Sequence, residues 1–173
     1  MSITSRIKNR LIARLITRYP SLAERFITAY KPWESGEEIP WTPLKKPLSE
    51  CKLAVVTTSG VHHTDQQSFD MQDGEGDPTF RTINATTIGN SYRITHDYYD
   101  HSDAEKDLNI ILPIDRLREL QAAGIIGDLA ARHYSFMGHI DGHHIATLIG
   151  KSARQVVEKL LQDEVDVVLL TPA

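Results

Sequence analysis

The chain has 173 residues, of which 40% are hydrophobic and 24% charged, and its formal net charge is -4. This is the composition of a folded globular domain, and the acidic excess argues against a general nucleic-acid binder, which needs surplus Lys and Arg to neutralise phosphates. No apolar stretch approaches the roughly 20 residues of a membrane-spanning helix, and the basic N-terminus lacks the apolar core and cleavage site of a signal peptide. We therefore expect a cytoplasmic protein with no membrane span and with small-molecule or protein partners.

Residues 1–31 are predicted to form an amphipathic helical arm. Apolar residues recur every four positions from Ile3 to Leu15, with Arg and Lys opposite, and Pro20 separates this helix from a second one. We favour an arm that packs on its own domain or on a sister subunit. Attachment to an anionic membrane surface is the alternative, because basic amphipathic helices bind there.

A proline-rich linker and an α/β domain follow. Residues 32–50 contain four prolines, which interrupt both helix and sheet. The domain, residues 51–173, opens with a Val-rich run at 52–58 that is typical of a buried parallel strand, and a second such run lies at 165–170.

Helical and extended patterns alternate between these two strands. After a long polar loop at 60–80, short strands are predicted at 92–95 and 133–137 and helices at 115–123 and 145–161. The apolar positions expected to face inward are Leu117, Leu120, Leu148, Ile149, Val156, Leu160 and Leu161. Helix followed by strand, twice over, predicts an α/β fold with a mainly parallel sheet in three layers, Rossmann-like or flavodoxin-like.

Histidines and carboxylates gather in the loops of this predicted sheet, and ligands of such sheets bind beyond the carboxyl ends of the strands. Imidazole and carboxylate groups could orient a substrate or protonate a leaving amine. The candidate catalytic residues are His62, His63, His101, Asp100 and Asp103. The candidate substrate-binding residues are Thr58, Ser59, Gly60, Asp65, His133, Ser135 and His139.

Each of these residues also has a simpler structural interpretation. Any single His could hydrogen-bond a loop backbone, Asp100 and Ser102 could cap a following helix, and the segment 57–60 could be a plain turn rather than an anion nest. The single cysteine, Cys51, excludes an internal disulfide and a thiolate zinc cluster. Because no His pair has the HExxH spacing, we assign no metal ligand.

Three stretches of the domain carry a family resemblance: THDYYDHSDAEKDLN at 95–109, ILPIDRLREL at 111–120 and HYSFMG at 133–138. With them, roughly residues 40–172 resemble the selenoprotein B family of glycine, betaine, sarcosine and D-proline reductases. The resemblance implies an oxidoreductase acting on a small amino-acid-like substrate within a reductase complex. In that family a pyruvoyl-bearing subunit holds the substrate as a Schiff base, while the selenolate of selenoprotein B attacks its α-carbon and expels the amine.

The family's redox motif, a selenocysteine or cysteine followed closely by another cysteine, comes just after the strand that reads VDVVLLTP here. The chain ends at Ala173 without that motif. The resemblance therefore implies no cofactor within this chain and a selenocysteine downstream. Because the chain ends immediately after a predicted buried strand, we hypothesise that a UGA selenocysteine codon was read as stop. A genuine short relative that lost the nucleophile is the alternative.

Three functions follow from these observations. The first is a component of a reductase that cleaves a C–N bond. A non-catalytic ligand-binding or assembly subunit of the same family is the alternative, and a His/Asp metal-dependent enzyme that uses His62, His63 or His101 is a second alternative. A homo-oligomer is expected in each case, because a final strand left at the edge of the sheet would expose apolar surface.

Overall fold

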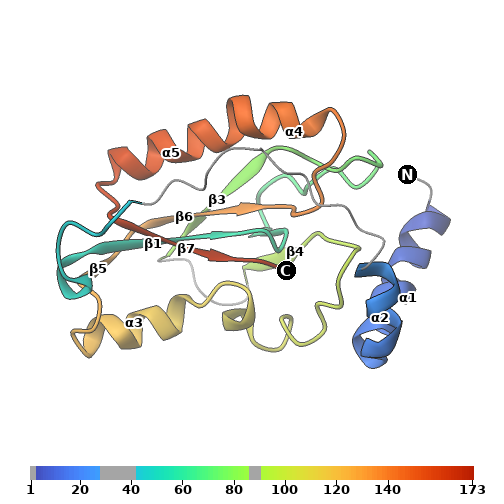
Figure 1. Ribbon diagram of the computed structural model, residues 1–173, viewed down its shortest axis with the longest axis horizontal. Helices are drawn as coiled ribbons and strands as arrows, with labels where there is room; N and C mark the ends of the chain where they lie inside the picture. Colours follow the sequence, from blue (N-terminus) through green and yellow to red (C-terminus); the bar gives the residue numbers. More distant parts are fainter. Residues whose placement is uncertain (1–2, 28–41, 86–90) are drawn as a thin grey trace.

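The computed structural model describes residues 3–27, 42–85 and 91–173. A curled sheet lies between two layers of helix, and two N-terminal helices lie beyond one end of it (Figure 1). The main sheet contains β1 (Lys52–Thr57), β3 (Phe80–Asn84), β5 (Asp128–Leu129), β6 (Arg132–Phe136) and β7 (Val167–Thr171), and β2 (Val61–His63) pairs with β4 (Tyr92–Ile94). The helices are α1 (Ile3–Arg18), α2 (Pro20–Ile27), α3 (Ile114–Ala122), α4 (His144–Thr147) and α5 (Ala153–Gln162), with short turns at Leu48–Glu50 and Leu108–Ile110.

β1 is the central strand, as its continuous apolar run predicts. It pairs in parallel with β5 and β6 on one side and with β7 on the other, whereas β3 runs antiparallel to β6 at the far edge. Leu53, Ala54 and Val55 are all buried. Fully burying a side chain such as Val55 contributes roughly 1.5–3 kcal/mol, so a run of such residues suffices to place this strand inside.

Helices cover both faces of the sheet. α4 and α5, joined by a π turn at Leu148–Ser152, lie over one face, and α3 lies over the other (Figure 1). Val156 and Leu160 of α5 pack against Ala54 and Tyr134, while Leu117 of α3 belongs to the opposite core with Val55. The predicted α/β class and mainly parallel sheet are confirmed at this level.

Three helix positions expected to face inward are instead exposed. Leu120 is 36%, Ile149 46% and Leu161 69% exposed. Only one stripe of a helix can face a sheet, and Leu161 lies about 100° around α5 from the buried Leu160. Ile149 lies in the π turn, where the extra residue shifts the helical phase.

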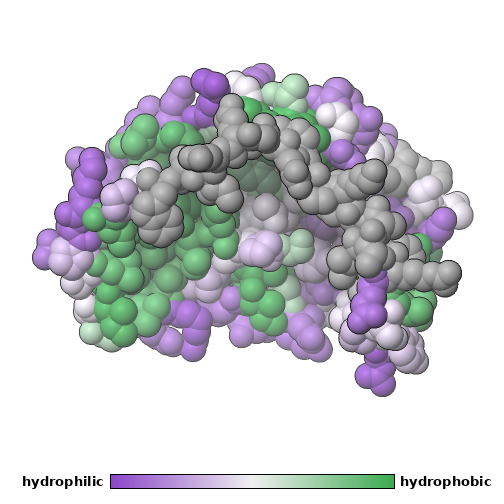
Figure 2. Space-filling model, in the orientation of Figure 1, coloured by the Kyte–Doolittle hydropathy of each residue, from purple (hydrophilic) through white to green (hydrophobic). Residues whose placement is uncertain are grey.

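The last strand is also more exposed than predicted. β7 pairs only with β1 among the described strands, and Leu170 is 70% exposed. Figure 2 shows hydrophobic residues gathered on this face, over β7 and toward α3. The apolar run therefore predicts the strand correctly but not its burial, because burial also requires a neighbouring strand or helix.

The N-terminal arm meets the domain through charge. Arg6 and Arg10 of α1 contact Asp97, whereas Ile7 and Leu11 on the apolar stripe are 55% and 61% exposed. The described part of the arm therefore contacts its own domain through its basic face, and packing of the apolar stripe on a sister subunit stays a prediction. The division into units at 1–31, 32–50 and 51–173 stays a prediction, and residues 28–41 lie outside the described residues.

Candidate functional site

The parallel strands β1, β6 and β7 end on the same side of the sheet, the side that faces α1 (Figure 1). Thr58 follows β1, Gly138 follows β6 by two residues, and Thr171 closes β7. The Thr58 amide donates to the Thr171 carbonyl at 3.1 Å, so the strand ends lie against one another. This is the position at which the parallel sheet predicts a ligand site.

Two glycines allow the loops at this end to approach closely. Gly60 has φ +71°, and a Cβ there would lie 2.4 Å from the Thr95 carbonyl oxygen. Gly138 has φ +93°, and its Cβ would lie 2.2 Å from the Thr58 carbonyl oxygen and 3.2 Å from His96 Nε2. No other residue fits either position without moving backbone. The loops after β1, β4 and β6 therefore form one packed unit.

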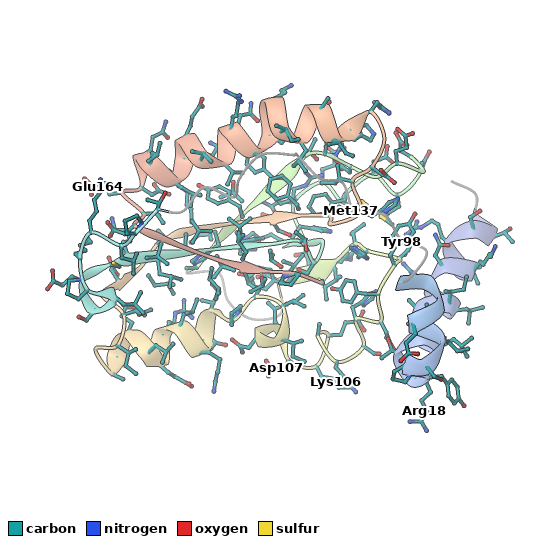
Figure 3. The ribbon with its side chains drawn as sticks, viewed as in Figure 1. Arg18, Tyr98, Lys106, Asp107, Met137 and Glu164 are labelled. Atoms are coloured by element: carbon teal, nitrogen blue, oxygen red, sulfur yellow. The ribbon has the colours of Figure 1, made fainter. Side chains whose placement is uncertain are left out.

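Five aromatic and imidazole rings line this unit, and we call them the ring cluster: His96, Tyr98, Tyr99, His101 and His139. The His96 ring lies 4.7 Å from that of Tyr99, and the Tyr98 ring lies 4.1 Å from that of His139. Figure 3 shows Tyr98 and the buried Met137 at the end of the sheet near α1. The cluster brings together two predicted residues, His101 and His139, with three that were not predicted as site residues.

Burial shifts the pKa of two members of the ring cluster, His96 and Tyr99. It lowers the pKa of His96 to about 4, with a smaller contribution from the nearby His139 and His101, so His96 is neutral near pH 7. The Tyr98 amide donates to His96 Nδ1 at 3.1 Å, which leaves the ring proton on Nε2, the nitrogen next to Gly138. Burial also raises the pKa of Tyr99, whose hydroxyl donates to the Ser59 carbonyl at 3.1 Å. Both groups act as neutral hydrogen-bonding groups.

The backbone amides of the segment 58–60 are already used within the chain. Besides the Thr58 bond, the Ser59 amide donates to Thr57 Oγ1 at 3.3 Å and the Gly60 amide donates to the Phe136 carbonyl at 2.8 Å. An anion at this segment would therefore have to displace these contacts.

His101 lies beside a small cavity of about 150 Å³ between α1 and its own loop. A helical turn places Glu105 Oε1 2.7 Å from His101 Nδ1, although the two are not aligned for a hydrogen bond. Asp100 accepts a hydrogen bond from the Ser102 amide at 3.2 Å, and Asp103 pairs with Lys106 at the surface. Glu105, rather than Asp100 or Asp103, is therefore the carboxylate next to His101.

His62 and His63 lie apart from the ring cluster and are engaged within the fold. His62 Nδ1 donates to the His63 carbonyl, and the Thr95 hydroxyl bonds His62 Nε2, both at 2.8 Å. The Asn84 amide donates to His63 Nε2 at 3.1 Å. Asp65 is exposed in the loop that follows β2.

His133 and Ser135 are buried within the main sheet. The Val55 amide donates to His133 Nδ1 at 3.0 Å. The imidazole thus replaces a backbone carbonyl as acceptor at the point along β1 where the neighbouring strand changes from β5 to β6. Burial lowers the pKa of His133 to about 4, with a smaller contribution from Arg118, and keeps the ring neutral. Ser135 Oγ donates to the Phe136 carbonyl.

Among the described residues, one group has the spacing of metal ligands: Asp73, His143 and His144. His62, His63 and His101, which the metal-enzyme alternative uses, are not part of it. Sequence reasoning missed this group because its members come from two loops about 70 positions apart. It also passed over His96, Tyr98 and Tyr99 as site residues, although they lie in the stretch 95–109 that carries the family resemblance.

Comparison with known proteins agrees with that resemblance. The family model described as glycine/sarcosine/betaine reductase selenoprotein B matches residues 4–173. The chain belongs to this family. D-proline reductase subunit gamma of Acetoanaerobium sticklandii is 34% identical over 131 residues, which cover 76% of this chain and 52% of the relative.

Two further relatives show the same pattern, whereas no solved structure matches this chain significantly. Glycine reductase complex component B subunit gamma of Symbiobacterium thermophilum is 31% identical over 86% of this chain and 34% of the relative. Sarcosine reductase complex component B subunit beta of Peptoclostridium acidaminophilum is 29% identical with the same two coverages, 86% and 34%. The chain thus spans between about a third and about half of the length of these relatives.

Proposed function

We propose that the chain is a component of a reductase system that cleaves the C–N bond of a small amino-acid-like compound of the glycine, betaine, sarcosine or D-proline type. Membership of the selenoprotein B family is the observation that carries this proposal. The selenol or thiol would lie just after residue 173. In support of this position, the Ala173 amide lies 3.3 Å from Thr58 Oγ1, so residues continuing from there begin next to the ring cluster.

The chemistry needs a nucleophile that is ionised near neutral pH, which suits a selenol because it is more acidic than a thiol. Its electron pair forms the bond to the α-carbon, and the electrons of the broken C–N bond leave with the amine, which takes up a proton. His101, paired with Glu105, is our candidate for the proton donor. The neutral His96 and Tyr99 would hold the surrounding loops in place.

Two exposed apolar surfaces support an assembly with other subunits. Leu170 lies on the open edge of β7, and Ile7 and Leu11 form an uncovered stripe on α1. Large apolar patches that are exposed on a folded protein are typical of interfaces.

We also propose a cytoplasmic location and a Rossmann-like or flavodoxin-like fold. The fold assignment is supported by helices on both faces of a mainly parallel sheet. Within the described residues, no helix has the length and apolarity to cross a membrane.

The reading frame of the gene tests the position of the nucleophile. We expect an in-frame UGA after codon 173, followed by coding sequence with a cysteine codon close by. Expression of that longer frame, combined with the substrate-holding subunit, should release an amine from one of the four substrate types. A UAA or UAG at that position contradicts the placement of the nucleophile.

The same assay tests the role of His101. His101→Gln is expected to lower kcat about 100-fold, because positioned acid–base groups typically contribute 10²- to 10⁴-fold. Glu158→Gln, on the exposed side of α5, is the control and should retain full turnover. Unchanged kcat in His101→Gln would leave the ligand-binding or assembly subunit as the better function.

The exposed edge predicts self-association of residues 1–173. Size-exclusion chromatography with light scattering should give a mass above the 19.5 kDa of one chain. Leu170→Lys should return the mass to that of a monomer, because a charged residue on an edge strand opposes pairing with another chain. A wild-type chain that elutes cleanly as a monomer would overturn this expectation.

A further inference from the structure

Two loops outside the ring cluster are joined through their backbones. Gly76 forms an isolated antiparallel bridge with Ile140, and the Asp141 amide donates to the Glu75 carbonyl at 2.8 Å. A Cβ at Gly76, where φ is +94°, would lie 1.7 Å from the His139 carbonyl oxygen. The loop before β3 and the loop after β6 are therefore held in one register, and the side chains that they carry are held with them.

Four polar side chains converge where these loops meet. His144 Nε2 lies 3.0 Å from Asp73 Oδ2, and His143 Nδ1 bonds to Glu75 Oε2. The rings of His143 and His144 lie 3.9 Å apart between centroids, at an interplanar angle of 40°. Asp73, His143 and His144 each offer one possible ligand atom, and these three atoms lie within 4.8 Å of one another.

Glu75 is held so that it orients His143. Its carboxylate packs against Gly142, where a Cβ would lie 2.3 Å from Glu75 Cδ, and it accepts the His143 backbone N–H at 3.2 Å. A carboxylate bonded to the ring nitrogen of a ligating histidine is the usual support around a metal site, because it selects the tautomer and the orientation of the ring.

We propose that Asp73, His143 and His144 bind a divalent transition-metal ion of the Zn²⁺ type, with Glu75 positioning His143. Two imidazoles and one carboxylate are a ligand set of catalytic zinc sites, which keep a further position open. Asp73 and His144 line an open cavity of about 590 Å³, so a water or a small anion could reach the metal.

Ordinary ion pairing is the competing explanation for this cluster. An imidazole can donate one ring N–H to a carboxylate without carrying a charge, so hydrogen bonds from His144 to Asp73 and from His143 to Glu75 could also form without a metal. The second ring nitrogen of each histidine is then an acceptor that can bind a metal ion. The two explanations therefore differ in whether the cluster binds added metal.

The site would also stabilise the ring cluster. His139 lies three residues from Gly142, and its Nε2 donates to the Gly74 carbonyl at 2.9 Å. A metal that ties the two loops together would hold His139 against Tyr98. Metal binding at this site needs neither a selenol nor a partner subunit. An experiment that disproves the metal site therefore leaves the proposed reductase function untouched, and the reverse also holds.

Calorimetric titration of the purified chain with ZnCl₂ tests the proposal. We expect one equivalent of saturable binding, abolished in His143→Ala and in His144→Ala. Glu75→Gln should weaken binding by about 10- to 100-fold, the typical cost of removing the group that orients a ligand. His101→Gln, which removes a histidine that also has a carboxylate beside it, is the matched control and should bind like the wild type. MgCl₂ should give no comparable binding, because imidazole favours transition metals.

Thermal unfolding with and without Zn²⁺ provides a second measurement. A ligand that binds only the folded state raises the melting temperature, so Zn²⁺ should raise that of the wild type and of His101→Gln but not that of the two alanine variants. Melting of each variant without metal also shows that it folds. Absent binding, or equal binding by the wild type and the alanine variants, would overturn the site.

Discussion

Lowering the pH from 7 to 4.5 is expected to reduce the free energy of unfolding by about 5 kcal/mol through two buried histidines. Burial lowers the pKa of both His96 and His133 from 6.5 to about 4. Between these values the unfolded chain takes up protons that the folded chain does not, so acid favours unfolding. The stabilisation is complete above pH 6.5, falls as the pH drops, and levels off below about pH 4. Urea titrations monitored by circular dichroism at both pH values measure it.

Substitution separates this titration from simple destabilisation. His133→Met removes one of the two groups and should roughly halve the pH dependence, although the Val55 amide loses its acceptor at a cost of about 1–3 kcal/mol at pH 7. Ile83→Val is the control: Ile83 is fully buried, and the change costs about 0.5–1.5 kcal/mol without removing a titrating group. Its pH dependence should match that of the wild type. Equal stability of the wild type at pH 7 and 4.5 would refute the assignment.

Replacing both Arg6 and Arg10 by Ala is expected to lower the free energy of unfolding by about 2–3 kcal/mol. Each arginine contacts the Asp97 carboxylate at 2.6 Å, and that carboxylate has no exposed surface. Removing the partners of a buried charge costs about 3–5 kcal/mol, and the smaller figure allows for arginines that are 36% and 51% exposed. Denaturant unfolding at pH 7 measures the loss.

The pKa of Asp97 gives an independent readout. Burial acts to raise it, and the hydrogen bonds from Arg6 and Arg10 outweigh burial, so the pKa lies below its ordinary value. Without the arginines the pKa should rise, and adding Asp97→Asn to the double variant should recover part of the lost stability. Lys8→Ala with Arg18→Ala removes the same charge from α1 and should leave stability nearly unchanged. Equal losses in both double variants would show that net charge, rather than the contact with Asp97, is responsible.

Local sequence patterns predict a helix or strand well where an apolar run, an apolar spacing or a start and stop signal marks it. The Val-rich run at β1, the acidic start and glycine stop of α3 and the four-residue spacing of α1 all correspond to described elements. β3 and β5 have no such signal, because FRTIN is short and half polar and β5 has two residues. Pairing with β6 and β1 makes them strands.

The candidate site likewise has features that the sequence can locate and features that depend on tertiary contacts. The loop positions of His101, His139 and the segment 58–60 follow from strand ends, which a sequence pattern can locate. The close approach at Gly60 and Gly138, by contrast, depends on which loops meet across the sheet.

Residue type and spacing were thus enough to indicate an α/β domain with a mainly parallel sheet, while three stretches of sequence carried the resemblance to its family. Tertiary structure decided what each histidine does: His133 completes a strand pairing, His96 is buried among rings, and His143 and His144 meet carboxylates from a distant loop. The physical reason is that protonation and ligand binding depend on burial and on neighbours within a few ångströms. Those neighbours are set by chain segments far apart in the sequence.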